Sequence, residues 1–192
     1  MLLGMFLLSF AEARSQEAAV ALPLDAAAYR VEGKVVHEGQ TLVVKTAFAE
    51  WRPKTSSLSI FLYPFELTPE ELAIYHEKHD YRPLKKSSPD PAKWPGRVPW
   101  VLIGLDFSGD HGSLTTAKIK GASVSYMNFK DAGSSATTSG DGFKLYEGFR
   151  SFVAKGSAVG DTIEFSLTFQ QKSPPCDIQV KGKTVIINHS KY

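Results

Sequence analysis

Apolar and polar residues alternate with a period of two along most of the chain after residue 20. This alternation, with its many β-branched and aromatic residues, is typical of strands that bury one face. The pattern predicts about nine or ten strands. They are 29–36, 41–50, 57–63, 99–107, 113–120, 122–129, 143–154, 161–171, 177–180 and 184–188.

Glycines mark the predicted turns between these strands. Gly39 lies between the first two strands and suits the positive φ of a hairpin turn. Gly121 separates the fifth predicted strand from the sixth, and Lys181-Gly182-Lys183 joins the last two as a tight hairpin. Residues 130–142 are rich in Ser, Thr and Gly, which predicts a polar loop.

One segment breaks the strand pattern and predicts a helix. Thr68 suits the N-cap position, Pro69 the first helical position, and Glu70 and Glu71 the first turn. We expect a helix from Pro69 to about His79, followed by a proline-rich surface excursion up to residue 99. Together they form a helix-plus-loop insertion over 65–99.

Many short strands, tight turns and a single helix indicate a mainly β protein. The two compatible architectures are an antiparallel β-sandwich and a partly closed barrel. We expect the sandwich, because the strands vary in length and show no regular repeat. Residues 20–192 would then form a single domain, as their number suggests.

The first residues have a different character. Met1 to Phe10 carry no charged side chain, and Ala11-Glu12-Ala13 matches the small-x-small pattern of a signal-peptidase site. The apolar stretch is far shorter than the ~20 residues of a membrane-spanning helix. We therefore expect a signal peptide over 1–19 and a periplasmic or secreted protein that does not span the membrane.

The net charge and the cysteine content exclude a nucleic-acid-binding class and an internal disulfide. The chain has 22 Lys+Arg against 20 Asp+Glu, a net charge of +2, which provides no basic face for nucleic acid. Its single cysteine, Cys176, forms no internal disulfide and is expected to be a small side chain that is buried or half-buried.

Two clusters carry residues that bind metal ions. His76 and His79 are three residues apart and share a helix face, and Asp106, Asp110 and His111 follow a strongly apolar strand. A divalent metal ion is the cofactor that they suggest. Each cluster also has an ordinary explanation, since His is favoured at helix C-termini and Asp in turns.

Aromatic residues near the insertion suggest a ligand site formed by Tyr63, Tyr81, Trp94 and Trp100. The alternative is that they fill the core. No blue-copper, serine-hydrolase or phosphate-loop pattern is present in the sequence.

Three functional hypotheses follow. The first is an exported binding protein without catalytic activity, for a small-molecule, glycan or protein ligand, with its contact surface on the insertion. The second is a metal-binding protein or metalloenzyme that uses the two clusters. The third is a structural subunit of an envelope assembly whose free sheet edge pairs with a partner strand.

Overall fold

The computed structural model describes residues 22–37, 39–78, 90–93, 98–108, 113–129, 136–138, 144–172 and 175–189. The strands are β1 (Arg30–His37), β2 (Gln40–Arg52), β3 (Ser57–Tyr63), β4 (Trp100–Ser108), β5 (Lys118–Met127), β6 (Ala136–Thr138), β7 (Phe149–Ala154), β8 (Thr162–Lys172) and β9 (Pro175–His189). The helix α1 spans Pro69–Lys78. Short 3-10 turns are η1 (Ala26–Tyr29), η2 (Pro53–Thr55), η4 (Pro91–Lys93) and η5 (Leu145–Gly148).

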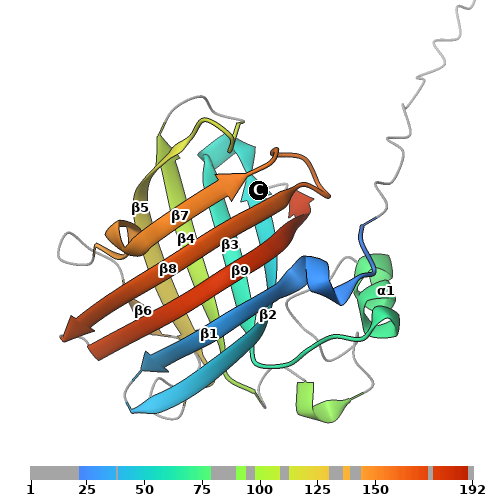
Figure 1. Cartoon of the computed structure of the whole chain (residues 1–192), viewed down its shortest axis with the longest axis horizontal. Helices are drawn as coiled ribbons and strands as arrows, with labels where there is room; N and C mark the ends of the chain where they lie inside the picture. The colour runs from blue at the N-terminus through green and yellow to red at the C-terminus, as the bar shows by residue number, and fades with distance from the viewer. Residues whose placement is uncertain are drawn as a thin grey trace, which may run out of the picture.

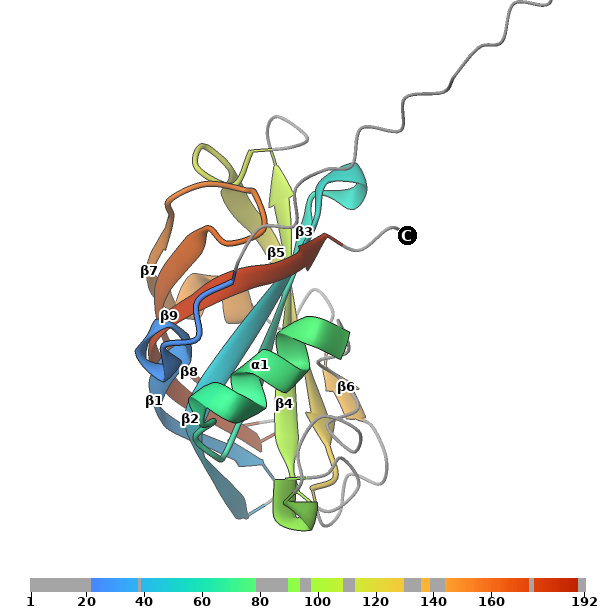
Figure 2. The same ribbon diagram turned by 90° about the vertical axis from the view of Figure 1, so that its right-hand side faces the viewer.

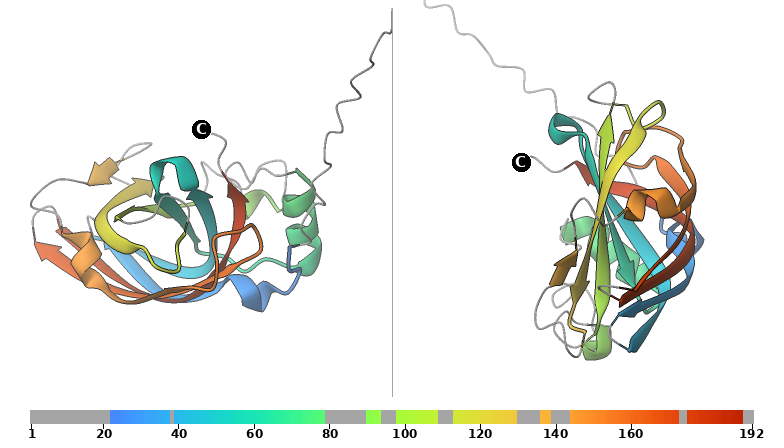
Figure 3. Two further views of the ribbon diagram at one scale, coloured as in Figure 1. Left: turned by 90° about the horizontal axis from the view of Figure 1, so that it is seen from above. Right: turned by 90° about the vertical axis from the view of Figure 1, so that its left-hand side faces the viewer.

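All described strands belong to one nine-stranded sheet with the order β6-β5-β4-β3-β2-β1-β9-β8-β7 (Figure 1). Strands adjacent in this order run antiparallel. The sheet curls into a half-barrel, which is clearest in the view from above (Figure 3). The mainly β class, the antiparallel pairing and the short helix are confirmed. A sandwich of two sheets is not confirmed, because pairing is unbroken from β6 to β7 across the described strands.

The long strand β9 helps to set the curl. Its first half pairs with β1 from Cys176 to Gly182. β1 begins only at Arg30, and beyond that point β9 lies beside β2, where Ile186 pairs with Ala49. This second pairing is parallel because β1 runs antiparallel to both strands.

Apolar side chains from both halves of the curled sheet meet in its concave interior. Val124 on β5 and Phe165 on β8 belong to the same buried cluster. The hydroxyl of Tyr126 on β5 lies 2.8 Å from the Cys176 sulfur on β9. Strands at distant positions in the sheet order therefore face each other, and the curl buries a core without a second sheet.

Two of the predicted strand breaks are wrong. Lys181-Gly182-Lys183 is not a hairpin, because Gly182 lies within β9 and pairs with Val31 on one side and Phe165 on the other. Gly121 does not end a strand either. It lies within β5 beside a register shift opposite Asp106, so the phase of the alternation changes while the strand continues.

The hairpin between β1 and β2 is as predicted, and Gly39 has a φ of +80°. The predicted polar loop over 130–142 is wrong at Ala136–Thr138, which form β6 against β5. Strand β7 is shorter than its prediction, because Leu145–Gly148 form the 3-10 turn η5.

Helix α1 covers the outer face of β2 and β4 (Figure 2). Beneath it lies a second apolar cluster that includes Leu72 of the helix, Phe48 and Ile187. The helix begins as predicted, since Thr68 Oγ1 accepts from the Glu71 amide and Glu71 Oε2 accepts from the Thr68 amide. This reciprocal arrangement is a capping box.

Among the described residues, no helix has the length and apolar character needed to cross a membrane. The predicted signal segment, residues 1–19, lies outside the described part of the chain.

Candidate functional site

A surface groove lies on the convex face of the sheet, over β1, β9 and β8. We call it the Gly182 groove, and its volume is about 580 Å³. Within the part of the chain that the structure describes, it is lined by Ala27, Arg30, Val31, Glu32, Glu164, Lys181, Gly182 and Lys183. Strand pairing brings these residues together from three separate parts of the sequence.

The floor of the Gly182 groove is bare backbone. Val31, Gly182 and Phe165 lie side by side across the three strands, and the side chains of Val31 and Phe165 are buried in the concave core. Gly182 has a φ of +150°, and a Cβ there would lie 2.5 Å from the Arg30 carbonyl oxygen. Only glycine fits this close approach of β1 and β9.

Charged side chains form the walls of the Gly182 groove. Lys181 Nζ lies 3.0 Å from Glu32 Oε1, and Glu164 Oε1 lies 3.6 Å from Lys155 Nζ outside the groove. Both carboxylates of the groove therefore face a cation already. Arg30 and Lys183 are exposed, and no ion pair is recorded for either among the described residues. The groove thus presents two cations to solvent beside a floor without side chains.

The aromatic residues predicted to bind a ligand lie in different surroundings. Tyr63 is 1% exposed and Trp100 is 9% exposed, and their ring centroids are 5.9 Å apart in the cluster beneath α1. In the structure, Tyr63 and Trp100 pack between α1 and the sheet. Tyr81 and Trp94 lie outside the described residues, so the ligand role of this set stays a prediction.

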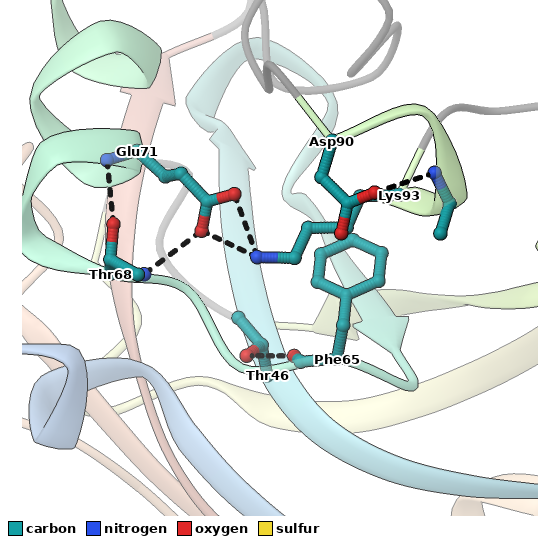
Figure 4. Close-up of polar contacts among 7 residues, drawn as sticks. Thr46, Phe65, Thr68, Glu71, Asp90 and Lys93 are labelled. Atoms are coloured by element: carbon teal, nitrogen blue, oxygen red, sulfur yellow. Dashed lines mark hydrogen bonds and ion pairs between the residues drawn. The ribbon is translucent and has the colours of Figure 1, made fainter.

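Within the insertion, an ion pair with little exposure joins the turn η4 to the helix α1 (Figure 4). Lys93 Nζ lies 2.7 and 2.6 Å from the two carboxylate oxygens of Glu71, and the side chains are 16% and 7% exposed. The Lys93 ammonium also lies 5.9 Å from the centre of the Phe65 ring. The turn η4 is therefore held against the N-terminal end of the helix.

Of the predicted metal ligands, the structure describes His76 and Asp106. Tyr29 Oη lies 3.1 Å from His76 Nε2 and donates to the Pro23 carbonyl at 3.1 Å. The contact with Tyr29 occupies His76 Nε2, and the tautomer of the ring determines which of the two groups donates. Asp106 is exposed on β4.

No three His, Cys, Asp or Glu side chains within the described ranges are grouped for metal binding. His79, Asp110 and His111 are beyond those ranges, so the metal site stays a prediction that elemental analysis of the purified protein would test.

Three buried side chains with polar atoms, those of His37, Tyr126 and Cys176, lie together at one end of the concave core. The ring of His37 stacks on that of Tyr126, with centroids 3.7 Å apart and planes 3° from parallel. Cys176 is 4% exposed, which confirms the buried reading of this residue. Burial raises the pKa of Cys176, although the hydrogen bond from Tyr126 opposes this rise. Burial, aided by Cys176, raises the pKa of Tyr126. This thiol is therefore protected from reaction.

These raised pKa values predict a loss of stability in alkali. The ordinary pKa is 9.0 for the thiol and 10.0 for the phenol, so the unfolded chain releases these protons first. The stabilising contribution is complete below pH 9 and is lost as the pH rises, because the folded state retains the protons. Urea unfolding at several pH values should show this fall, and Cys176→Ala should flatten its onset. An unchanged slope in Cys176→Ala would contradict the assignment.

Comparisons with known proteins found no matching family model, no matching curated protein and no matching solved structure.

Proposed function

We propose that this chain is an exported binding protein without catalytic activity, which holds a small organic anion in the Gly182 groove. The observation that carries the proposal is the pair of exposed cations, Arg30 and Lys183, beside a floor of bare backbone. A volume of about 580 Å³ lies within the range of small-molecule sites.

The charge arrangement favours an anion over a cation as the ligand. A cationic ligand would have to compete with Lys181 for Glu32 and with Lys155 for Glu164. A carboxylate would instead meet Arg30, whose guanidinium can donate two parallel hydrogen bonds, and the ammonium of Lys183. Export is supported by the uncharged apolar start of the sequence and by Ala11-Glu12-Ala13.

Binding of hexanoate, a simple organic anion, tests this function. In calorimetry at low salt we expect a Kd of about 0.1–1 mM, because the groove is open and water competes for its charges. Arg30→Gln should weaken binding by about tenfold, since it removes a charge-assisted hydrogen bond. Binding should also weaken as salt is added.

The matched control is Lys54→Gln, which removes one exposed cation at η2, away from the groove lining. It should bind hexanoate as the wild type does. Equal weakening in Lys54→Gln and Arg30→Gln would show that only net charge matters, and the proposed site would then be wrong.

A further inference from the structure

A second depression adjoins the Gly182 groove on the same convex face. We call it the Gly33 groove, and its volume is about 390 Å³. Among the described residues its lining is Glu32, Gly33, Ser166, Leu167, Thr168, Gln179, Val180 and Lys181. Glu32 and Lys181 line both grooves, so their ion pair forms the ridge between them.

The two grooves have related floors. Gly33 pairs with Val180, and Val180 pairs with Leu167, whose side chain points into the concave core. Gly33 has a φ of +138°, and a Cβ there would lie 1.8 Å from the Gln179 carbonyl oxygen. The floor is again bare backbone, two rows of paired residues from the first, and the row that contains Glu32 and Lys181 lies between them.

The chemistry of the Gly33 groove differs from that of its neighbour. Its walls carry the hydroxyls of Ser166 and Thr168 and the side-chain amide of Gln179. Gln179 Nε2 donates to the Asp177 carboxylate at 3.0 and 3.3 Å, which orients the amide. Within the described ranges no side-chain hydrogen bond is found for the two hydroxyls or for Gln179 Oε1. The groove therefore offers neutral donors and acceptors.

We propose that the two grooves form one site for a hydroxylated organic acid of the sugar-acid class. This inference rests on the proposed function, because the carboxylate is placed at Arg30 and Lys183. The hydroxyls of the ligand then reach Ser166, Thr168 and Gln179 across the Glu32–Lys181 ridge. Lys183 and Gln179, which would hold the two ends of the ligand, are four residues apart along β9, about 13 Å at ~3.3 Å per residue. A hexose acid with a hydrogen bond of about 2.8 Å at each end covers a similar span.

The described lining residues of the two grooves include no aromatic side chain, and this also bears on the ligand. If Trp or Tyr side chains lined the grooves, the apolar face of a sugar ring could stack on them and contribute to affinity. Here recognition depends on hydrogen bonds and charge, so a ligand lacking either the acid or the hydroxyls should bind more weakly.

Calorimetry with three probes tests the inference: D-glucuronate, D-glucose and hexanoate. We expect D-glucuronate to bind about tenfold more tightly than hexanoate, and D-glucose to bind most weakly. Thr168→Val removes one hydroxyl at constant shape and should weaken D-glucuronate binding more than hexanoate binding. Thr162→Val, on the same strand but outside both linings, is the matched control and should change neither.

The outcomes distinguish a failure of this inference alone from a failure of the proposed function. If hexanoate binds as tightly as D-glucuronate, the Gly33 groove has no part in recognition and this inference is overturned, while the anion site stands. If D-glucose binds as tightly as D-glucuronate, the carboxylate is not recognised and both proposals fail. If none of the three probes binds, both proposals fail as well.

Discussion

Gly33→Ala is expected to lower the free energy of unfolding by at least about 3 kcal/mol, or to prevent folding. Gly33 has a φ of +138°, and a Cβ there would lie 1.8 Å from the Gln179 carbonyl oxygen and 2.9 Å from the Val180 Cα. These are backbone atoms of the neighbouring strand, so relief requires β1 and β9 to separate. Their pairing joins the two halves of the sheet.

Gly39→Ala provides the matched control. Gly39 also has a positive φ, +80°, but a Cβ there would meet no atom within 4 Å. Gly39→Ala should lower the free energy of unfolding by only about 1 kcal/mol, because alanine is disfavoured in the left-handed backbone conformation. Urea unfolding followed by circular dichroism measures both variants. Equal losses would mean that the close approach of β1 and β9 is relaxed in solution, against the structure described above.

The second large loss of stability is expected when the ion pair between Glu71 of α1 and Lys93 of η4 is broken. Glu71→Gln should lower the free energy of unfolding by about 2–3 kcal/mol, because it leaves the poorly exposed Lys93 ammonium without its counter-ion. Glutamine can still accept from the Thr68 amide, so the capping box is largely preserved. The variant therefore isolates the charge interaction from the start of the helix.

The double variant Glu71→Gln/Lys93→Met should recover a large part of this loss, since no buried charge is then left unpaired. Proteolysis near η4 should be faster in Glu71→Gln and return toward the wild-type rate in the double variant. As a control, Lys155→Gln removes one partner of an exposed pair and should leave the unfolding midpoint unchanged. Additive effects of Glu71→Gln and Lys93→Met would contradict a direct interaction.

Local patterns in the sequence predicted much of the fold. The bounds of β3 and the start of α1 follow from alternation and from Thr68 and Pro69, which act within a few residues. The continuity of β9 was missed because Lys181-Gly182-Lys183 resembles a turn. A signal was present, however. Cys176, Ile178 and Val180 keep the same phase as Thr184 and Ile186, which a hairpin at Gly182 has no reason to preserve.

The candidate site was not predicted from the sequence, for a physical reason. Arg30, Lys183 and Glu164 belong to three strands, and charges on exposed strand positions ordinarily indicate only a solvated face. Their proximity depends on β1 pairing with β9, which is a contact between the two ends of the described chain. The aromatic residues Tyr63 and Trp100 were recognisable from composition, whereas their burial depends on where α1 packs.

The most direct test of the proposed site is an NMR titration of the isotope-labelled protein with hexanoate at low salt, following every backbone amide. The proposal predicts saturable shifts centred on Val31, Gly182 and Lys183, and a midpoint at about tenfold higher hexanoate concentration in Arg30→Gln. Saturable shifts centred instead on Asp106 or on α1, or no saturable shifts at all, would contradict an anion site in the Gly182 groove.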